Sequence, residues 1–150
     1  MTYFQYRNST LYAEHVAVQE IVEMYGTPCF IYSKASLIQN FRAYTDALTD
    51  MPHLICFGTK ANPNIAILNI LANEGAGFDI VSIGELERVI AAGGDPKKIV
   101  FSGVGKQKHE LIRALEVGIH CFNVESTAEL EQLNCIACEL GTVAPISLRI

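Results

Sequence analysis

The sequence predicts an α/β protein built around a parallel β-sheet. From residue 54 onward, short apolar segments alternate with helical patterns, and glycines follow the helical stretches. Strict alternation of this kind implies parallel strands joined by right-handed crossovers. Such a sheet is either doubly wound or part of an eight-stranded (β/α) barrel. Five expected strands and four expected helices from residue 54 to the end amount to about half a barrel.

The expected elements are bounded by recognisable signals. Ser82 with Glu85, and Ser126 with Glu129, have the spacing of a capping box, in which serine and glutamate satisfy the first free amides of a helix. The helices are expected to end at glycines that can adopt a left-handed conformation: Gly75, Gly93, Gly118 and Gly141. The expected strands are 29–32, 54–59, 78–81, 99–102, 121–124 and 146–150.

Residues 1–53 follow a different pattern from the rest of the chain. A short strand is expected around 3–6, with helices over 16–25 and 35–48. This segment is expected to be a lead-in that packs beside the sheet. Immediately after the 54–59 strand, Asn62-Pro63 is expected to open a helix with proline at its favoured first position.

The composition limits the class of partner. Half of the residues are hydrophobic, 18% are charged, and the net charge is −5 at pH 7. An acidic chain without a basic cluster is not typical of a nucleic-acid-binding protein. No apolar stretch has the length of a membrane span, and the first residues lack the apolar core of a signal peptide. We therefore expect a soluble, cytoplasmic protein with no nucleic-acid or membrane partner.

The cysteines are expected to be free thiols. Their number is odd, and Cys29, Cys56 and Cys121 lie in apolar runs where a small buried thiol fits. Cys135 and Cys138 form a CxxC pair within a helical pattern, without the second pair that a zinc site requires. The four histidines also lack the spacing of metal ligands. No metal site is expected.

Three charged residues are candidates for one functional site. Side chains alternate along a strand. In three of the expected strands one face is bulky and apolar, whereas the other carries small residues and a single charge near the carboxyl end: Lys60, Asp79 and Arg149. Barrels and open α/β sheets place their chemistry at that end of the strands. The alternative is that each charge lies in a solvated loop.

The segment from Ser102 to Lys106 is similar to a phosphate-binding loop but fails two of its requirements. A P-loop needs a glycine separated from its Gly-Lys pair by four residues, and serine or threonine after that pair. Val100 and Gln107 occupy the corresponding places. No nucleotide site is expected here.

Two motifs carry a resemblance to a known family. Residues 57–62 (FGTKAN) followed by 77–86 (GFDIVSIGEL) resemble the fold-type-III, alanine-racemase-like, pyridoxal-phosphate-dependent decarboxylases. Gly58 is a small departure, because relatives commonly have alanine there. Five further segments resemble the branch of this family that acts on diaminopimelate: 4–8, 11–14, 25–32, 99–106 and 121–126.

The resemblance implies a fold and a set of roles. Residues 36–150 would be the N-terminal portion of a pyridoxal-phosphate-binding (β/α)8 barrel, and residues 1–35 a lead-in that contributes to a C-terminal β domain absent from this chain. Lys60 would be the catalytic residue that bonds covalently to pyridoxal 5'-phosphate. Asp79 and Arg149 would bind the cofactor, and Glu85 matches another acidic position more weakly. The groups that hold the cofactor's phosphate and pyridine nitrogen are expected beyond Ile150.

The implied activity is decarboxylation of meso-2,6-diaminopimelate to L-lysine by a cytoplasmic homodimer. Two alternatives stay open. One is a related decarboxylase acting on ornithine, arginine or carboxynorspermidine, and the other is a non-catalytic barrel that only binds pyridoxal phosphate. Because the chain stops within an expected strand, it is expected to be a fragment that is inactive alone.

Overall fold

The computed structural model describes residues 3–150, and the chain divides into two compact units, Met1–Ala47 and Leu48–Ile150. Within the described residues, no helix combines the length and the apolar character needed to cross a membrane. Each unit has its own sheet. The candidate site residues lie in the second unit.

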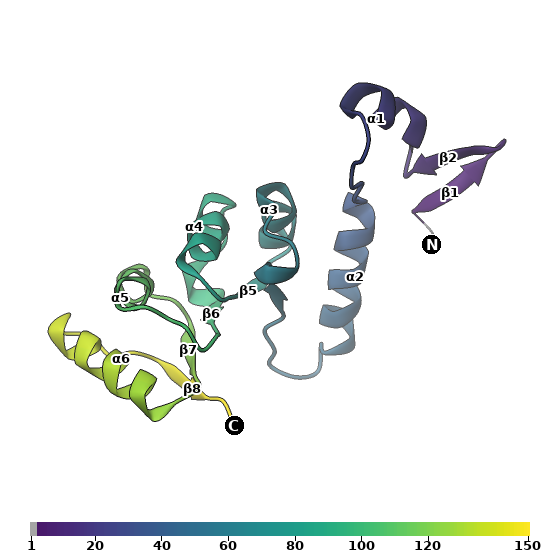
Figure 1. Cartoon of the computed structure of the whole chain (residues 1–150). Helices are drawn as coiled ribbons and strands as arrows, with labels where there is room; N and C mark the ends of the chain where they lie inside the picture. Colours follow the sequence, from purple (N-terminus) through teal and green to yellow (C-terminus); the bar gives the residue numbers. More distant parts are fainter. Residues whose placement is uncertain (1–2) are drawn as a thin grey trace. The chain divides into compact units, whose positions relative to one another are not determined.

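The first unit contains a small antiparallel sheet and two helices (Figure 1). Its strands pair in the order β1-β2-β3, and a tight turn with positive φ at Asn8 and Ser9 joins the first two. The predicted strand and both predicted helices are confirmed, and two further strands complete the sheet. The elements are β1 (Phe4–Arg7), β2 (Thr10–Ala13), β3 (Val16–Ala17), α1 (Val18–Tyr25) and α2 (Lys34–Ala47).

The predicted strand over 29–32 is wrong. These residues form no regular element, and Phe30 is 91% exposed. The segment has the apolar composition of a strand, but a strand also needs a partner for its backbone amides and carbonyls. No segment among residues 3–150 pairs with it.

The second unit contains the predicted parallel sheet, whose five strands follow one another in space as they do in the chain. The registers align Gly58 with Asp79, and Asn123 with Ser147. The five strands predicted from residue 54 onward are confirmed, most of them one to three residues shorter than expected. They are β4 (Cys56–Gly58), β5 (Gly77–Ile80), β6 (Ile99–Phe101), β7 (Cys121–Val124) and β8 (Ile146–Leu148).

The helices of the second unit form a row along one side of this sheet (Figure 1). Crossovers of one hand between consecutive neighbouring strands place every helix on the same face. A doubly wound sheet would instead reverse its strand order and carry helices on both faces. The arrangement therefore matches part of a barrel. The helices are α3 (Ile65–Asn73), α4 (Ile83–Ala91), α5 (Lys108–Val117) and α6 (Thr127–Glu139), with short 3-10 helices η1 (Thr59–Ala61) and η2 (Pro96–Lys98).

The hydrophobic core lies between the sheet and these helices. Alternate strand residues such as Phe78, Phe101 and Phe122 have no exposed surface, and neither do Leu86 and Leu111 from the helices. Fully burying a side chain of this size contributes about 1.5–3 kcal/mol. Within the second unit, no helix lies over the opposite, inner face of the sheet. It presents the polar residues that the alternation predicts.

The predicted helix boundaries are confirmed at most positions. Ser82 Oγ accepts the amide of Glu85, and Ser126 Oγ accepts the amide of Glu129. Each glutamate reaches back to the residue before the serine rather than to the serine itself. The glycines expected to end helices all have positive φ: Gly75, Gly93, Gly118 and Gly141.

The start of α3 differs from the prediction. Pro63 does not occupy the first helical position, because Asn64 is the N-cap and its side chain accepts the amide of Ala66. Asn62 Oδ1 accepts the amide of Asn64 at 3.1 Å. This local turn competes with helix formation at Pro63, so the helix begins two residues later.

Candidate active site

Lys60 is positioned by a 3-10 turn rather than by the strand pleat. The sequence predicted a strand through Thr59, but β4 ends at Gly58 and the chain turns at once into η1. Thr59 is fully buried, whereas Lys60 is exposed. Within residues 3–150 the Lys60 amine has no hydrogen bond or ion pair. It is therefore free to react with a bound group.

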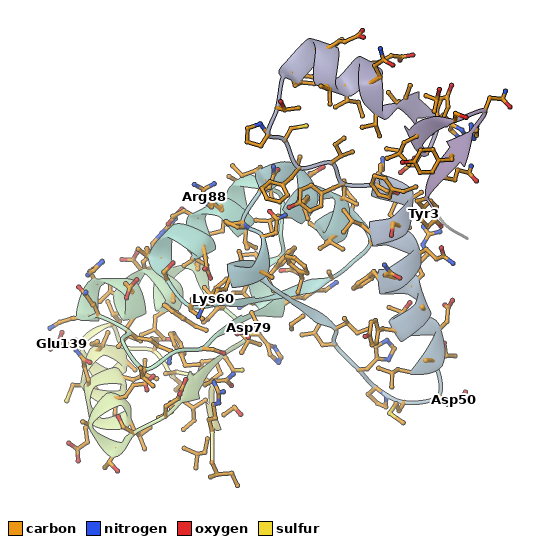
Figure 2. All side chains as sticks on the ribbon, turned by 45° about the vertical axis from the view of Figure 1, so that its right-hand side comes forward. Tyr3, Asp50, Lys60, Asp79, Arg88 and Glu139 are labelled. Carbon is orange, nitrogen blue, oxygen red and sulfur yellow. The ribbon has the colours of Figure 1, made fainter. Side chains whose placement is uncertain are left out.

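Asp79 lies on the strand next to Lys60. It is aligned with Gly58, two residues before the lysine, and η1 contacts β5. Figure 2 shows Lys60 and Asp79 close together. A Cβ added at Gly58 would meet no atom within 4 Å, so an alanine would also fit at this position.

Asp79 is the end of a row of hydrogen bonds that crosses three strands. Ser102 Oγ donates to Asp79 Oδ1 at 2.5 Å, and Asn123 Nδ2 donates to Ser102 Oγ at 2.9 Å. These residues come from β5, from the residue after β6, and from β7. Ser102 was not among the predicted site residues. Strand parity places it on the inner face together with Val100, and this signal could have identified it.

Arg149 is not brought into direct contact with Asp79. It follows β8, which is separated from β5 by β6 and β7. Its Nη1 lies 3.4 Å from Glu125 Oε1, which also accepts the amide of Gly103 at 2.8 Å. Because the Arg149 side chain is 62% exposed, this ion pair contributes little to stability. It does connect the end of β8 to the loop after β6.

Lys106, in the segment that is similar to a phosphate loop, is a structural residue. Its side chain is fully buried. The ammonium donates to the carbonyls of Gly103 and Asn123, each at 2.7 Å, and to Glu129 Oε1 at 2.6 Å. It also lies 5.7 Å from the centre of the Phe101 ring. With its donors used, this amine holds the loop and β7 together and is not available for chemistry.

The predicted burial of the cysteines is wrong. Cys29 is exposed, as are Cys135 and Cys138 in α6, while Cys56 and Cys121 are half-buried. Cys29 belongs to the unpaired segment, and the other two predicted positions face the inner side of the sheet, which the helices do not cover. All five are free thiols, as predicted.

The two half-buried thiols are held in their neutral form. Partial burial raises the pKa of the Cys56 thiol, and the nearby negative charge of Asp79 raises it further. The same two causes raise the pKa of Cys121. Neither is a strong nucleophile at neutral pH, because the thiolate is the reactive form. Within residues 3–150 no cluster of three or more His, Cys, Asp or Glu side chains could hold a metal ion.

A family model matches most of the chain. Residues 34–150 match the model described as "Pyridoxal-dependent decarboxylase, pyridoxal binding domain". Among curated relatives, the diaminopimelate decarboxylases of Pseudomonas aeruginosa and Haemophilus influenzae are 61% and 56% identical to this chain over its whole length. The chain spans 36% of the length of each of these two relatives.

Solved structures agree with this match. A diaminopimelate decarboxylase from M. jannaschii, in complex with L-lysine, has a TM-score of 0.94 and 33% identity. The match covers 97% of this chain and 35% of that one. A Helicobacter pylori diaminopimelate decarboxylase with L-lysine has a TM-score of 0.86 and 43% identity, over 89% of this chain and 34% of the other.

Proposed function

Because this chain belongs to the pyridoxal-dependent decarboxylases through their pyridoxal-binding domain, we propose that the complete protein decarboxylates meso-2,6-diaminopimelate to L-lysine. The observation that carries the proposal is Lys60. It is a primary amine without a partner among the described residues, it follows the carboxyl end of a parallel strand, and the neighbouring strand carries Asp79. That is where barrels place their reactive groups.

The residues present fit the aldehyde end of pyridoxal phosphate. An aldehyde requires a free amine, which Lys60 offers, and space around it, which Gly58 leaves open. Asp79 supplies a carboxylate on the neighbouring strand, and the hydroxyl of Ser102 holds one of its oxygens. These residues are therefore compatible with an aldehyde-bearing cofactor.

The proposed roles follow from these positions. Lys60 would hold the cofactor covalently through its amine. When bound, pyridoxal phosphate accepts the electron pair left on the substrate when CO2 departs. Asp79 orients the Lys60 amine and neutralises its positive charge. Arg149, held by Glu125 at the edge of the site, contributes a positive charge toward the cofactor.

The substrate is proposed from the relatives, because the described residues do not include a complete substrate pocket. Relatives at 61% and 56% identity are named diaminopimelate decarboxylases. A site built for the distal amino-acid group of diaminopimelate would leave buried polar groups unpaired with ornithine or arginine. The complete protein should therefore form L-lysine rapidly and act poorly on these shorter or differently ended substrates. Equal turnover of ornithine would overturn the substrate assignment while keeping the decarboxylase assignment.

Borohydride reduction tests the cofactor assignment. Reducing the complete protein in the presence of pyridoxal phosphate and mapping its peptides should locate a pyridoxyl group on Lys60. Recovery of the label on Lys106 or Lys34 would overturn the assignment. A labelled Lys60 in a protein that releases no CO2 from any basic amino acid would instead favour a non-catalytic cofactor-binding barrel.

Three further proposals concern the assembled protein. Residues 1–35 are proposed to complete a C-terminal β domain. The complete protein is proposed to be a cytoplasmic homodimer, which sedimentation would test. Residues 1–150 alone are proposed to be inactive and to associate, because β4 and β8 each pair on one side only within the described residues 3–150. A stable monomeric fragment that forms lysine would contradict the last proposal.

A further inference from the structure

The two hydrogen bonds that link Asn123, Ser102 and Asp79 both run in the same direction, from Asn123 as donor towards Asp79 as acceptor. An amide nitrogen can only donate, so Ser102 Oγ accepts from Asn123 Nδ2. The single hydroxyl proton of Ser102 is then directed to Asp79 Oδ1, at 2.5 Å. A hydrogen bond from a hydroxyl to a carboxylate is short and about twice as strong as one between neutral groups.

The two donors are fixed by the sheet. Ser102 is only 5% exposed, and its amide donates to the carbonyl of Ile80 at 2.8 Å. The carbonyl of Asn123 accepts from the buried ammonium of Lys106 at 2.7 Å. Because both backbones are held by neighbouring elements, the two side chains present their donors to Asp79 at a set position.

Only one of the two carboxylate oxygens of Asp79 takes part in the row of hydrogen bonds, so the other is available to the site. Ser102 occupies Oδ1 of Asp79, and Oδ2 has no hydrogen bond among residues 3–150. A carboxylate held by one oxygen cannot rotate freely, so the orientation of the second oxygen is set as well. That oxygen is the one available to Lys60 and to the cofactor that Lys60 binds.

We propose that Ser102 is a positioning residue for the pyridoxal site, which orients Asp79 toward Lys60, and that Asn123 acts through Ser102. The inference rests on the proposed function, because it assigns Asp79 a task at the cofactor. It goes beyond that function by adding two residues that do not touch the reacting atoms, one directly after β6 and one on β7. In a purely structural role, the Ser102 hydroxyl would stabilise the strand ends whether or not Asp79 is present.

A double-mutant cycle on the complete protein separates these two roles. The variants are Ser102→Ala, Asn123→Ala, Asp79→Ala and both double combinations with Asp79→Ala. The readouts are the dissociation constant of pyridoxal phosphate and the pH dependence of the visible absorption of the bound cofactor. Ser147→Ala is a matched control. This serine lies on the same face of the sheet, aligned with Asn123, and its hydroxyl has no hydrogen bond within residues 3–150.

The expected result is a loss of affinity that depends on Asp79. Ser102→Ala should weaken cofactor binding about tenfold, the scale of one hydrogen bond to a charged group, and shift the pH profile. Asn123→Ala should act in the same direction by a smaller factor. In the Asp79→Ala background neither substitution should have a further effect, and Ser147→Ala should have none in either background.

Two results would overturn the inference. One is that Ser102→Ala and Asp79→Ala weaken binding additively. The other is that Ser102→Ala leaves both the affinity and the pH profile unchanged. If Ser102→Ala does not fold, the cycle of Asn123 with Asp79 decides by the same criterion. Failure of the proposed function is distinguishable, since it would appear in the wild-type protein as no label on Lys60 or no lysine formed.

Discussion

Lys60 and Lys106 lie on the same sheet in opposite environments. Each follows a strand, β4 for Lys60 and β6 for Lys106. Lys60 is exposed and unpaired within the described residues, whereas Lys106 is fully buried and donates to three oxygens. The comparison shows that a lysine near a strand end is not reactive by position alone. Its amine must also be left without partners by the surrounding backbone.

Replacing Lys60 in the complete protein should have the largest effect on activity. Lys60→Ala should lower lysine formation on the order of 10³-fold or more, the scale seen when a covalent catalytic group is removed. Its effect on the free energy of unfolding should stay within about 0.5 kcal/mol, because the side chain is exposed. Enzyme assays and urea denaturation measure both. Residual activity near the wild-type level would place the reactive amine elsewhere.

Lys106→Met should have its main effect on stability. The substitution leaves the Glu129 carboxylate buried without its partner, which costs about 3–5 kcal/mol. Lys108→Met is the matched control, because its pair with Glu139 is exposed and should be worth less than about 1 kcal/mol. Denaturation midpoints of the two variants test this. Equal effects would mean that burial of Lys106 has little energetic consequence.

Thr59 offers a smaller test next to Lys60. Its hydroxyl is buried without a hydrogen-bond partner within the described chain, unlike the fully paired ammonium of Lys106. Thr59→Val should therefore stabilise the protein by about 1 kcal/mol, by removing an unsatisfied polar group at nearly constant volume. The thermal midpoint of the complete protein would measure the change. A loss of stability would show that the hydroxyl has a partner in the rest of the protein.

The cysteines also differ in reactivity between half-buried and exposed positions. The raised pKa of Cys56 and of Cys121 keeps both neutral at pH 7, and reaction requires the thiolate. Alkylation followed by mass spectrometry should therefore modify them more slowly than the exposed Cys135 and Cys138. Raising the pH toward their pKa values should narrow the difference. Faster labelling of Cys56 than of Cys135 would contradict the assigned environments.

Elements that depend on nearby residues could be predicted from the sequence. The five parallel strands and the caps at Ser82 and Ser126 follow from alternation and from spacings of three residues. The start of α3 could not be predicted in the same way, because the turn at Asn62 outweighed the preference of Pro63 for the first helical position.

The candidate site was predictable in part. Parity placed Asp79 on the inner face, and the structure confirms that position. The turn that carries Lys60 was not foreseen, because the strand signal continues through Thr59. Parity also places Ser102 on the inner face, but its hydrogen bond to Asp79, 23 residues away in the chain, has no signature within one segment. The cysteines were misjudged because an apolar neighbourhood in sequence does not show which face the helices cover.

The consecutive strand order also bears on how the chain folds. Paired residues such as Cys56 with Gly77, Phe78 with Ile99 and Val100 with Cys121 are 21 positions apart in each case. Parallel pairing usually requires distant segments to meet, which slows folding. In this sheet a single α-helix separates each pair of neighbouring strands in the chain. Each strand can therefore dock as soon as it and the helix before it have left the ribosome. Structure can therefore spread from the amino end in steps of one strand and one helix.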